Sequence, residues 1–280
     1  MQLAMINDKI VPLDELDGVY NDRAMYFGDG VYEVIRSYNG KIFAIDEHLS
    51  RFAESLEKIE ITSVNIEQIK SRIVKAFKTA DIANAKIYFH ITRGQAPRNH
   101  ASPADLEPAF FLTIDELGDD SAVKQNGIAV STHADLRWKR CDIKSLNLLP
   151  NVLARLDATR KGCDEAILVD ENELITEGAG SAFFAILGGK IQTAPLTANI
   201  LPSITRKYTL LAAKNIGLEV VEKSFTPQQA AGADELFTAV TTKDIIGVVK
   251  FDGETIGDGK PGKYTKLLIE QFRDFVGKRI

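Results

Sequence analysis

The chain is poor in the residues that build metal sites and disulfides. It has two cysteines and four histidines, and the cysteines, Cys141 and Cys163, form no Cys-x-x-Cys pair. The histidines are scattered without the spacing of metal ligands, so the sequence gives no support for a structural zinc site or for metal catalysis. We therefore expect two reduced thiols and no bound metal.

Long apolar runs and a targeting segment are missing as well. No run approaches the roughly 20 apolar residues that span a bilayer. The first residues, Met-Gln-Leu-Ala-Met-Ile-Asn-Asp, lack a basic segment followed by an apolar one. These features predict a cytoplasmic protein without a membrane partner.

An excess of basic residues and the common nucleotide motifs are absent too. The 34 Lys and Arg residues stand against 39 Asp and Glu, and the net charge is −5. Nucleic acid is therefore not an expected partner, because binding to a phosphate backbone needs a basic surface. No Gly-x-Gly-x-x-Gly follows a predicted strand, and neither a Walker A loop nor a Gly-x-Ser-x-Gly elbow occurs, which weakens the dinucleotide, nucleoside-triphosphate and hydrolase interpretations.

What is present is an ordinary globular composition, with 45% hydrophobic and 26% charged residues. A chain of 280 residues is near the upper limit for one hydrophobic core, which favours two domains. The stretch from Asp115 to Gly127 is acidic and lies between strand-like runs. We predict an α+β fold with a smaller N-terminal domain over residues 1–118 and a larger, β-rich domain over residues 119–280.

The clearest local pattern is a hairpin near the N-terminus. Two β-rich runs, 31–38 and 41–45, are joined by Asn39-Gly40, the pair that best supplies the positive φ angles of a type I′ turn. Asp46 is then the expected N-cap of a helix with apolar residues at helical spacing. Arg51 does not lie on the apolar face of this predicted helix.

Further elements follow from the same periodicities. The helices are predicted at 66–79, 151–161, 203–215 and 227–231. The strands are predicted at 86–92, 109–114, 128–133, 165–169, 174–175, 181–187 and 235–242. A loop from Gly94 to Asp105 carries Pro97-Arg98-Asn99-His100.

Single residues in unusual settings are the first candidates for chemistry: Lys144 among apolar neighbours, Glu177 before a glycine, and the Arg98/His100 pair. Each alone is more often structural, as an extended surface lysine, a solvated turn residue or a polar loop. Together they form part of a larger pattern. Five motifs occur in a characteristic order and spacing: Phe27-Gly-Asp-Gly-Val-Tyr-Glu-Val, Thr92-Arg-Gly-Gln-Ala-Pro-Arg-Asn-His, Cys141-Asp-Ile-Lys-Ser-Leu-Asn-Leu-Leu, Thr176-Glu-Gly and Ile204-Thr-Arg.

With these motifs the sequence resembles the fold-type IV pyridoxal-phosphate enzymes, over about residues 5 to 275. The lysine and Thr-Glu-Gly motifs are typical of the whole superfamily, and the Pro-Arg-x-His loop is typical of its D-amino-acid branch. The resemblance implies a sandwich-like N-terminal domain and a C-terminal pseudo-barrel. It also implies pyridoxal 5′-phosphate as cofactor.

The resemblance assigns roles to the motif residues. Lys144 would bind the cofactor aldehyde and then carry the proton that leaves the substrate α-carbon, so it must be deprotonated near neutral pH. Glu177 would face the pyridine nitrogen and keep it protonated. The phosphate would be held by Arg51 and by the N–H groups of Ile204 and Thr205 at a helix N-terminus. The remaining cofactor contacts implied are those of Thr241, Arg137 and Leu201.

The resemblance also implies a substrate site shared between two subunits of a homodimer. The substrate carboxylate would meet Tyr32 together with Arg98 and His100 of the neighbouring subunit. Val34 and Arg36 share the strand face of Tyr32, because side chains alternate along a strand. A second cation at Arg36 would extend substrate choice toward dicarboxylates.

The expected activity is transfer of the amino group of small D-amino acids such as D-alanine to 2-oxoglutarate, giving pyruvate and D-glutamate by a ping-pong mechanism. A branched-chain L-aminotransferase is the first alternative. Arg36 and Ala179-Gly180 favour it, whereas Arg98/His100 and Leu148, where that branch tends to carry tyrosine, oppose it. An aminodeoxychorismate lyase, and a protein that carries the cofactor without turnover, remain open as well.

Overall fold

The computed structural model describes residues 2–197 and 199–279, and its smaller sheet is built from the N-terminal part of the chain. This sheet is antiparallel, in the order β4-β3-β5-β6. Two helices, α2 (Ile45–Lys58) and α3 (Ile66–Ala80), cover one of its faces with a shared apolar core. Its strands are β3 (Gly30–Tyr38), β4 (Lys41–Ile42), β5 (Ala85–Thr92) and β6 (Ala109–Glu116).

Strand alternation decides what the two faces of this sheet carry. Val31 and Ile35 are fully buried under the helices, and so is Glu33 between them. Tyr32, Val34 and Arg36 point to the opposite face because alternate side chains leave a strand on opposite sides.

The predicted hairpin is confirmed, with one correction at its second strand. Asn39 and Gly40 have φ angles of 49° and 79°, as a type I′ turn requires. Strand β4 ends at Ile42, however, and helix α2 begins at Ile45 with Ala44 at the N-cap. The prediction of Asp46 as N-cap was therefore wrong: its carboxylate instead pairs with Lys70 at 2.6 Å.

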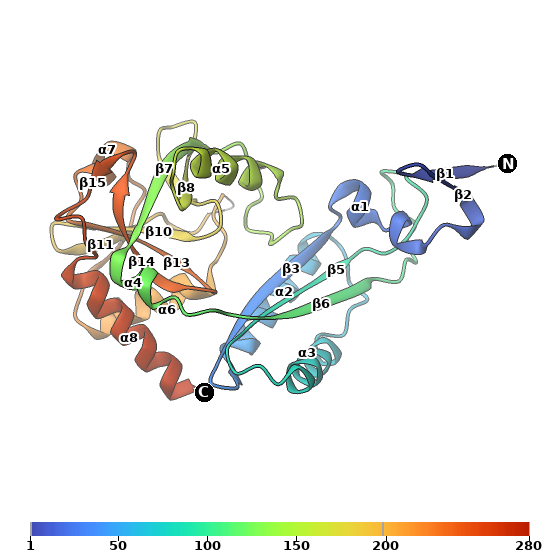
Figure 1. Cartoon of the computed structure of the whole chain (residues 1–280), viewed down its shortest axis with the longest axis horizontal. Coiled ribbons are helices and arrows are strands. Elements are labelled where there is room, and N and C mark those ends of the chain that lie inside the picture. The colour runs from blue at the N-terminus through green and yellow to red at the C-terminus, as the bar shows by residue number, and fades with distance from the viewer. Residues whose placement is uncertain (1, 198, 280) are drawn as a thin grey trace.

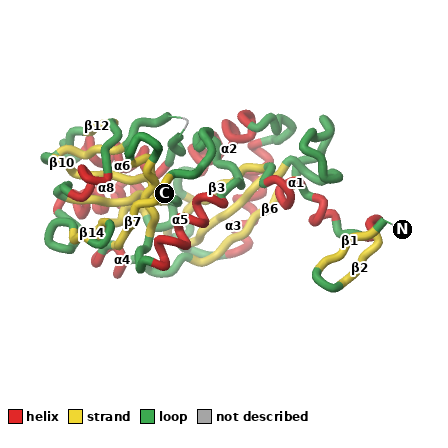
Figure 2. The backbone as a smooth tube through the Cα atoms, turned by 90° about the horizontal axis from the view of Figure 1, so that it is seen from above, coloured by secondary structure: helices red, strands yellow, loops and turns green. Residues whose placement is uncertain are grey.

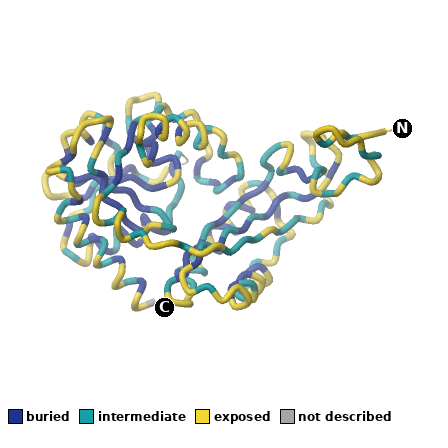
Figure 3. The backbone as a smooth tube through the Cα atoms, viewed as in Figure 1, coloured by how far each residue is buried: buried dark blue, intermediate teal, exposed yellow. Residues whose placement is uncertain are grey.

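The N-terminal residues form an arm that the sequence analysis did not predict. Strands β1 (Leu3–Ile6) and β2 (Lys9–Pro12) make a separate two-stranded hairpin. Figures 1 and 2 show this hairpin projecting from the far end of the molecule, and most of it is exposed in Figure 3. Two short 3-10 turns, at Leu13–Glu15 and Gly18–Asn21, and helix α1 (Arg23–Phe27) lead from it to β3.

Over the residues described, the larger sheet has nine strands and forms the core of the rest of the molecule. Its order is β12-β11-β10-β13-β14-β7-β8-β9, with β15 paired to β14. The central strands are almost wholly buried, as Figure 3 shows. The strands are β7 (Ile128–Ala134), β8 (Glu165–Val169), β9 (Ile175–Gly178), β10 (Ala182–Leu187), β11 (Lys190–Thr193), β12 (Val220–Glu222), β13 (Glu235–Val240), β14 (Asp244–Phe251) and β15 (Glu254–Thr255).

Helices cover this curled sheet and hold its loops in place. Helices α6 (Ile204–Asn215) and α8 (Lys263–Arg279) share one apolar core with β10 and β13. On the other face Ala230 of α7 (Pro227–Ala231) packs with Phe225 and Phe183. Helix α5 (Leu149–Arg160) lies against β7 and β8.

The chain passes from the smaller to the larger sheet through residues 117–127, which include the short helix α4 (Ser121–Asn126). The mixed α and β fold, with a curled β-rich sheet in its larger part, is as expected. The exact division into residues 1–118 and 119–280 stays a prediction. Among the residues described, no helix is both long and apolar enough to cross a membrane.

Candidate active site

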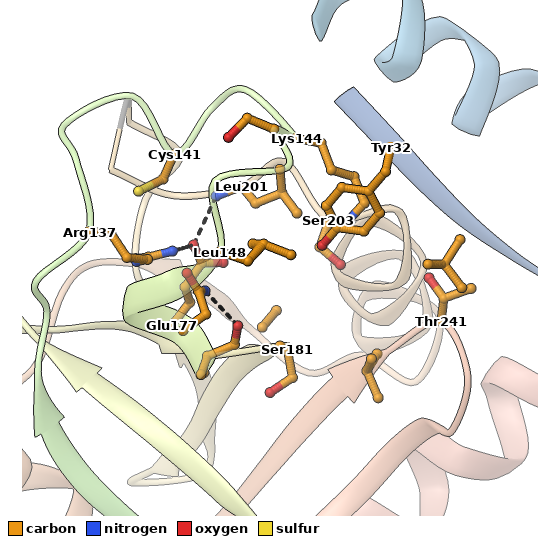
Figure 4. A pocket seen from close by; sticks show the side chains of 18 of the residues that line it. Tyr32, Arg137, Cys141, Lys144, Leu148, Glu177, Ser181, Leu201, Ser203 and Thr241 are labelled. Atoms are coloured by element: carbon orange, nitrogen blue, oxygen red, sulfur yellow. Dashed lines mark hydrogen bonds and ion pairs between the residues drawn. The ribbon is translucent and has the colours of Figure 1, made fainter. Parts of the chain in front are cut away.

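A cavity of about 280 Å³ lies between the two sheets. Segments far apart in the sequence meet there: strand β3, the loop before α5, the β9–β10 turn, the start of α6 and the β13–β14 turn (Figure 4). The predicted residues that line it are Tyr32, Val34, Arg51, Arg137, Lys144, Glu177, Leu201 and Thr241.

Lys144 is held in the cavity by its backbone. Its carbonyl oxygen accepts a hydrogen bond from the Tyr32 N–H over 3.0 Å, and its own N–H donates to Ser55 Oγ over 3.2 Å. The next residue, Ser145, forms an antiparallel bridge with Val31 of β3. The loop that carries Lys144 is thus fixed to the smaller sheet, and its Nζ lies 4.2 Å from the centre of the Tyr32 ring.

Glu177 is a buried carboxylate at one end of the cavity, on strand β9. Its Oε1 accepts hydrogen bonds from Arg137 Nη1 over 2.6 Å and from the Leu201 N–H over 3.1 Å, and both donors are drawn in Figure 4. Burial raises the pKa of Glu177, and the Arg137 guanidinium opposes that rise. The carboxylate is thereby held in one position facing the cavity.

All three nitrogens of the Arg137 guanidinium donate hydrogen bonds. Its Nε and Nη2 donate to the two carboxylate oxygens of Asp135 over 2.9 and 2.7 Å, and Nη2 also reaches the Asn199 carbonyl. A guanidinium held in this fork cannot turn away from Glu177. The structure places Arg137 in the cavity wall as the residue that positions Glu177.

Arg51 also lines the cavity, beside a buried cluster that the sequence analysis missed. Its Nε and Nη2 donate to Glu33 over 2.7 and 2.8 Å, and His48 Nδ1 lies 2.8 Å from Glu33 Oε2. Burial would raise the pKa of Glu33, but Arg51 and His48 outweigh it and hold that pKa well below its usual range. Burial lowers the pKa of His48.

The start of helix α6 lies beside Arg51. Ser203 caps the helix, its Oγ accepting from the Arg206 N–H over 3.1 Å. The N–H groups of Ile204 and Thr205 have no acceptor within the part of the chain that the structure describes, as expected for a first helical turn. Arg51 Nη1 donates to the neighbouring Pro202 carbonyl over 3.0 Å, which fixes its guanidinium at this helix end.

Three predicted substrate residues lie outside this cavity. Arg36 is buried between strands and bonds to Asp120, Thr242 and Asp244. Arg98 and His100 lie on the exposed loop beyond β5, where each packs against the Phe27 ring. Within a single chain, therefore, the predicted carboxylate-binding arginine and histidine are not brought to Lys144.

The structure also adds a residue that the sequence analysis did not consider. Lys86 of β5 lines the cavity on the side of Val34. Its β-strand was predicted, but only the register of β5 against β3 places it there. Asp135, which holds Arg137 from two residues away in the sequence, was also missed.

A lysine, a buried carboxylate and the capped start of a helix line one cavity, on a curled sheet beside a smaller α/β layer, an arrangement that fits a fold-type IV aminotransferase. The profile of the amino-transferase class IV family matches residues 30–251, and the chain belongs to that family.

Relatives and solved structures agree with this assignment. The chain is 39% identical to the D-alanine aminotransferase of Staphylococcus haemolyticus, over 100% of this chain and 99% of the relative. It is 38% identical to that of Bacillus licheniformis, over 94% and 93%. Among solved structures, a branched-chain amino acid aminotransferase from Escherichia coli superposes with a TM-score of 0.86 at 26% identity, covering 96% of this chain and 93% of the other. Another branched-chain amino acid aminotransferase, complexed with N-(5′-phosphopyridoxyl)-L-glutamate, gives 0.85 at 26%, covering 99% and 95%.

Proposed function

We propose that this enzyme uses pyridoxal 5′-phosphate to transfer the amino group of small D-amino acids, such as D-alanine, to 2-oxoglutarate. Pyruvate and D-glutamate are the products. The observation that carries the proposal is that Lys144, the buried Glu177 and Ser203, the N-cap of α6, line one cavity. The relatives named D-alanine aminotransferase, which match along nearly the whole chain, support the D-amino-acid substrate.

The residues of the cavity fit this cofactor by their chemistry. A phosphate monoester needs N–H donors and positive charge. The N–H groups of Ile204 and Thr205, next to the lining residue Ser203, would supply the donors, and Arg51 and Thr241 line the same cavity. A protonated pyridine nitrogen needs a buried carboxylate, which Glu177 supplies. When bound, the cofactor supplies the electron sink for the bond that breaks at the substrate α-carbon.

The chain's own residues then bind, orient and transfer the proton. Lys144 is the base within reach of the cavity, and its clamped backbone fixes the side from which it takes the α-proton. Tyr32 lies against Lys144 Nζ and forms the wall on which the substrate carboxylate is expected. Arg137 and the Leu201 N–H keep Glu177 aimed at the cofactor ring.

Arg98 and His100 complete the carboxylate site from a second copy of the chain in this proposal. An exposed apolar stripe next to the cavity supports a dimer that covers it. Leu149, Val152, Leu153 and Leu156 recur at helical spacing on α5, yet all four are exposed in the single chain. The protein is accordingly proposed to act as a cytoplasmic homodimer with the active site at the interface.

Two measurements test the proposal. Borohydride reduction of the protein with its cofactor should add a stable mass to the peptide that contains Lys144, and Lys144→Ala should abolish that adduct. Single-turnover absorbance changes should then be rapid with D-alanine and slow with L-leucine. An adduct on Lys139 or Lys161 would contradict the mechanism.

A branched-chain L-aminotransferase is the second candidate, because the solved structures that superpose on this chain include such enzymes and Ala179 and Gly180 line the cavity. A faster half-reaction with L-leucine than with D-alanine would favour it. Pyruvate release from aminodeoxychorismate would instead indicate the lyase.

A further inference from the structure

We propose that Lys86 binds the second carboxylate of dicarboxylic substrates, and that this lysine makes D-glutamate and 2-oxoglutarate acceptable to the enzyme. The inference rests on the proposed function and names the residue that reads the substrate's far end. It replaces the sequence-based hypothesis that Arg36 has this role.

The register of the smaller sheet places Lys86 on the cavity face. Lys86 pairs with Arg36 across the β3–β5 ladder, and Tyr88 pairs with Val34. The side chains of these four residues therefore all point to the face of the sheet that is opposite α2 and α3. Of the paired cations, Lys86 lines the cavity, whereas Arg36 does not.

Of the cavity cations in the part of the chain that the structure describes, Lys86 is the one with neither a buried carboxylate partner nor a role in the reaction. Arg51 is bound to both oxygens of Glu33, and Arg137 is held by Asp135 and Glu177. Lys144 has to remain available for the reaction. Among the residues described, Lys86 is thus the cavity cation left for a substrate anion.

The existing partner of Lys86 does not prevent this role. Its Nζ lies 3.1 Å from Asp115 Oδ2, but the lysine side chain is 39% exposed and that of Asp115 is 53% exposed. Ion pairs so open to solvent contribute little. Exchanging Asp115 for a substrate carboxylate in the less exposed cavity therefore costs little.

The positions proposed for the two carboxylates are separated along β3. Tyr32, where the α-carboxylate is expected, and the Arg36–Lys86 pair are four residues apart, which is about 13 Å along a strand. Val34 lies between them and lines the cavity. A long lysine side chain reaching inward leaves room for a short apolar segment over Val34 between two carboxylates.

The test compares substrates that differ in the second carboxylate. In Lys86→Gln, the ratio of kcat/KM for D-glutamate to that for D-alanine should fall roughly tenfold, as for loss of one hydrogen bond to a charged group. Lys86→Arg keeps the positive charge and should therefore retain much of the wild-type ratio. Asp115→Asn removes the competing carboxylate and should raise the ratio above that of the wild type.

The outcomes separate this inference from the function on which it rests. An unchanged ratio in Lys86→Gln would overturn the role of Lys86 while the D-alanine half-reaction stands. The same conclusion would follow if the ratio in Lys86→Arg were as low as in Lys86→Gln and the ratio in Asp115→Asn did not exceed that of the wild type. A wild-type enzyme that reacts with neither D-alanine nor D-glutamate would overturn the proposed function, and the assignment of Lys86 with it.

Discussion

Arg36 Nη1 donates a hydrogen bond to the Thr242 carbonyl oxygen over 2.8 Å, between residues 206 positions apart in the sequence. Thr242 belongs to the β13–β14 turn that lines the cavity, whereas Arg36 lies on β3 of the smaller sheet. The same guanidinium pairs with Asp120 at 3.1 Å and with Asp244 at 3.3 Å. One buried arginine thus connects the two sheets at the wall of the cavity.

Replacing Arg36 with Leu should therefore destabilise the whole protein. Removing one member of a buried charge cluster costs about 3 kcal/mol, near the lower end of the usual range because Lys124 still neutralises Asp120 and Asp244. Urea unfolding should show the loss. The matched control, Arg140→Leu, removes an exposed arginine and should change stability by less than about 0.5 kcal/mol.

The same variant distinguishes a positioning role from a substrate-binding one. Displacement of the Thr242 turn should lower kcat/KM for D-alanine and D-glutamate by similar factors. A selective loss of D-glutamate would mean that Arg36, and not Lys86, reads the second carboxylate.

Glu177→Gln should fold normally but react slowly. A carboxamide can still accept from Arg137 and from the Leu201 N–H, so the surrounding contacts survive. It cannot keep a pyridine nitrogen protonated, so the chemical step with D-alanine should slow by roughly 10²-fold, the lower range for a positioned acid–base group. Stopped-flow single-turnover rates measure this, and an unchanged rate would remove Glu177 from the mechanism.

Local signals in the sequence were enough for much of the fold. Asn39-Gly40 specifies its own turn, and Ser203 with the following apolar pattern specifies the start of α6. Helix α8 was missed although Leu268, Phe272 and Val276 recur at helical spacing and are buried. That signal was present and was not used.

The site was harder to predict because it depends on pairings between distant segments. Glu33 falls on the buried side of a strand, between Val31 and Ile35, which indicates a buried charge in need of a partner. Sequence alone does not say that Arg51 is that partner. The same limit explains Arg36, whose partners lie in the segment that links the two sheets and at the β13–β14 turn.

Glu33 should make stability depend on pH. Its pKa is lower in the folded chain than in the unfolded one, so its contribution is fully present above the unfolded value, about 4.3, and is lost as the pH falls through the folded value. Glu33→Gln leaves Arg51 without its buried partner and should cost about 3 kcal/mol at pH 7. Urea unfolding should show a constant penalty from pH 8 to 5 that shrinks below about pH 4.3. Glu54→Gln, on the exposed side of α2, is the control and should show neither effect.

The last prediction concerns the chain on which Arg98 acts. In one chain Arg98 packs over the Phe27 ring on an exposed loop and does not line the cavity of Lys144. If a neighbouring subunit supplies it, the Lys144→Ala and Arg98→Ala homodimers should each be severely impaired, because each pocket of either lacks one of the two residues. A heterodimer of the two variants has one pocket with both defects and one with both residues intact. Refolding the variants together and isolating the heterodimer through two different tags should therefore restore activity close to one wild-type site per dimer. If Arg98 acted within its own chain, every pocket would keep one defect and the mixed dimer would stay inactive.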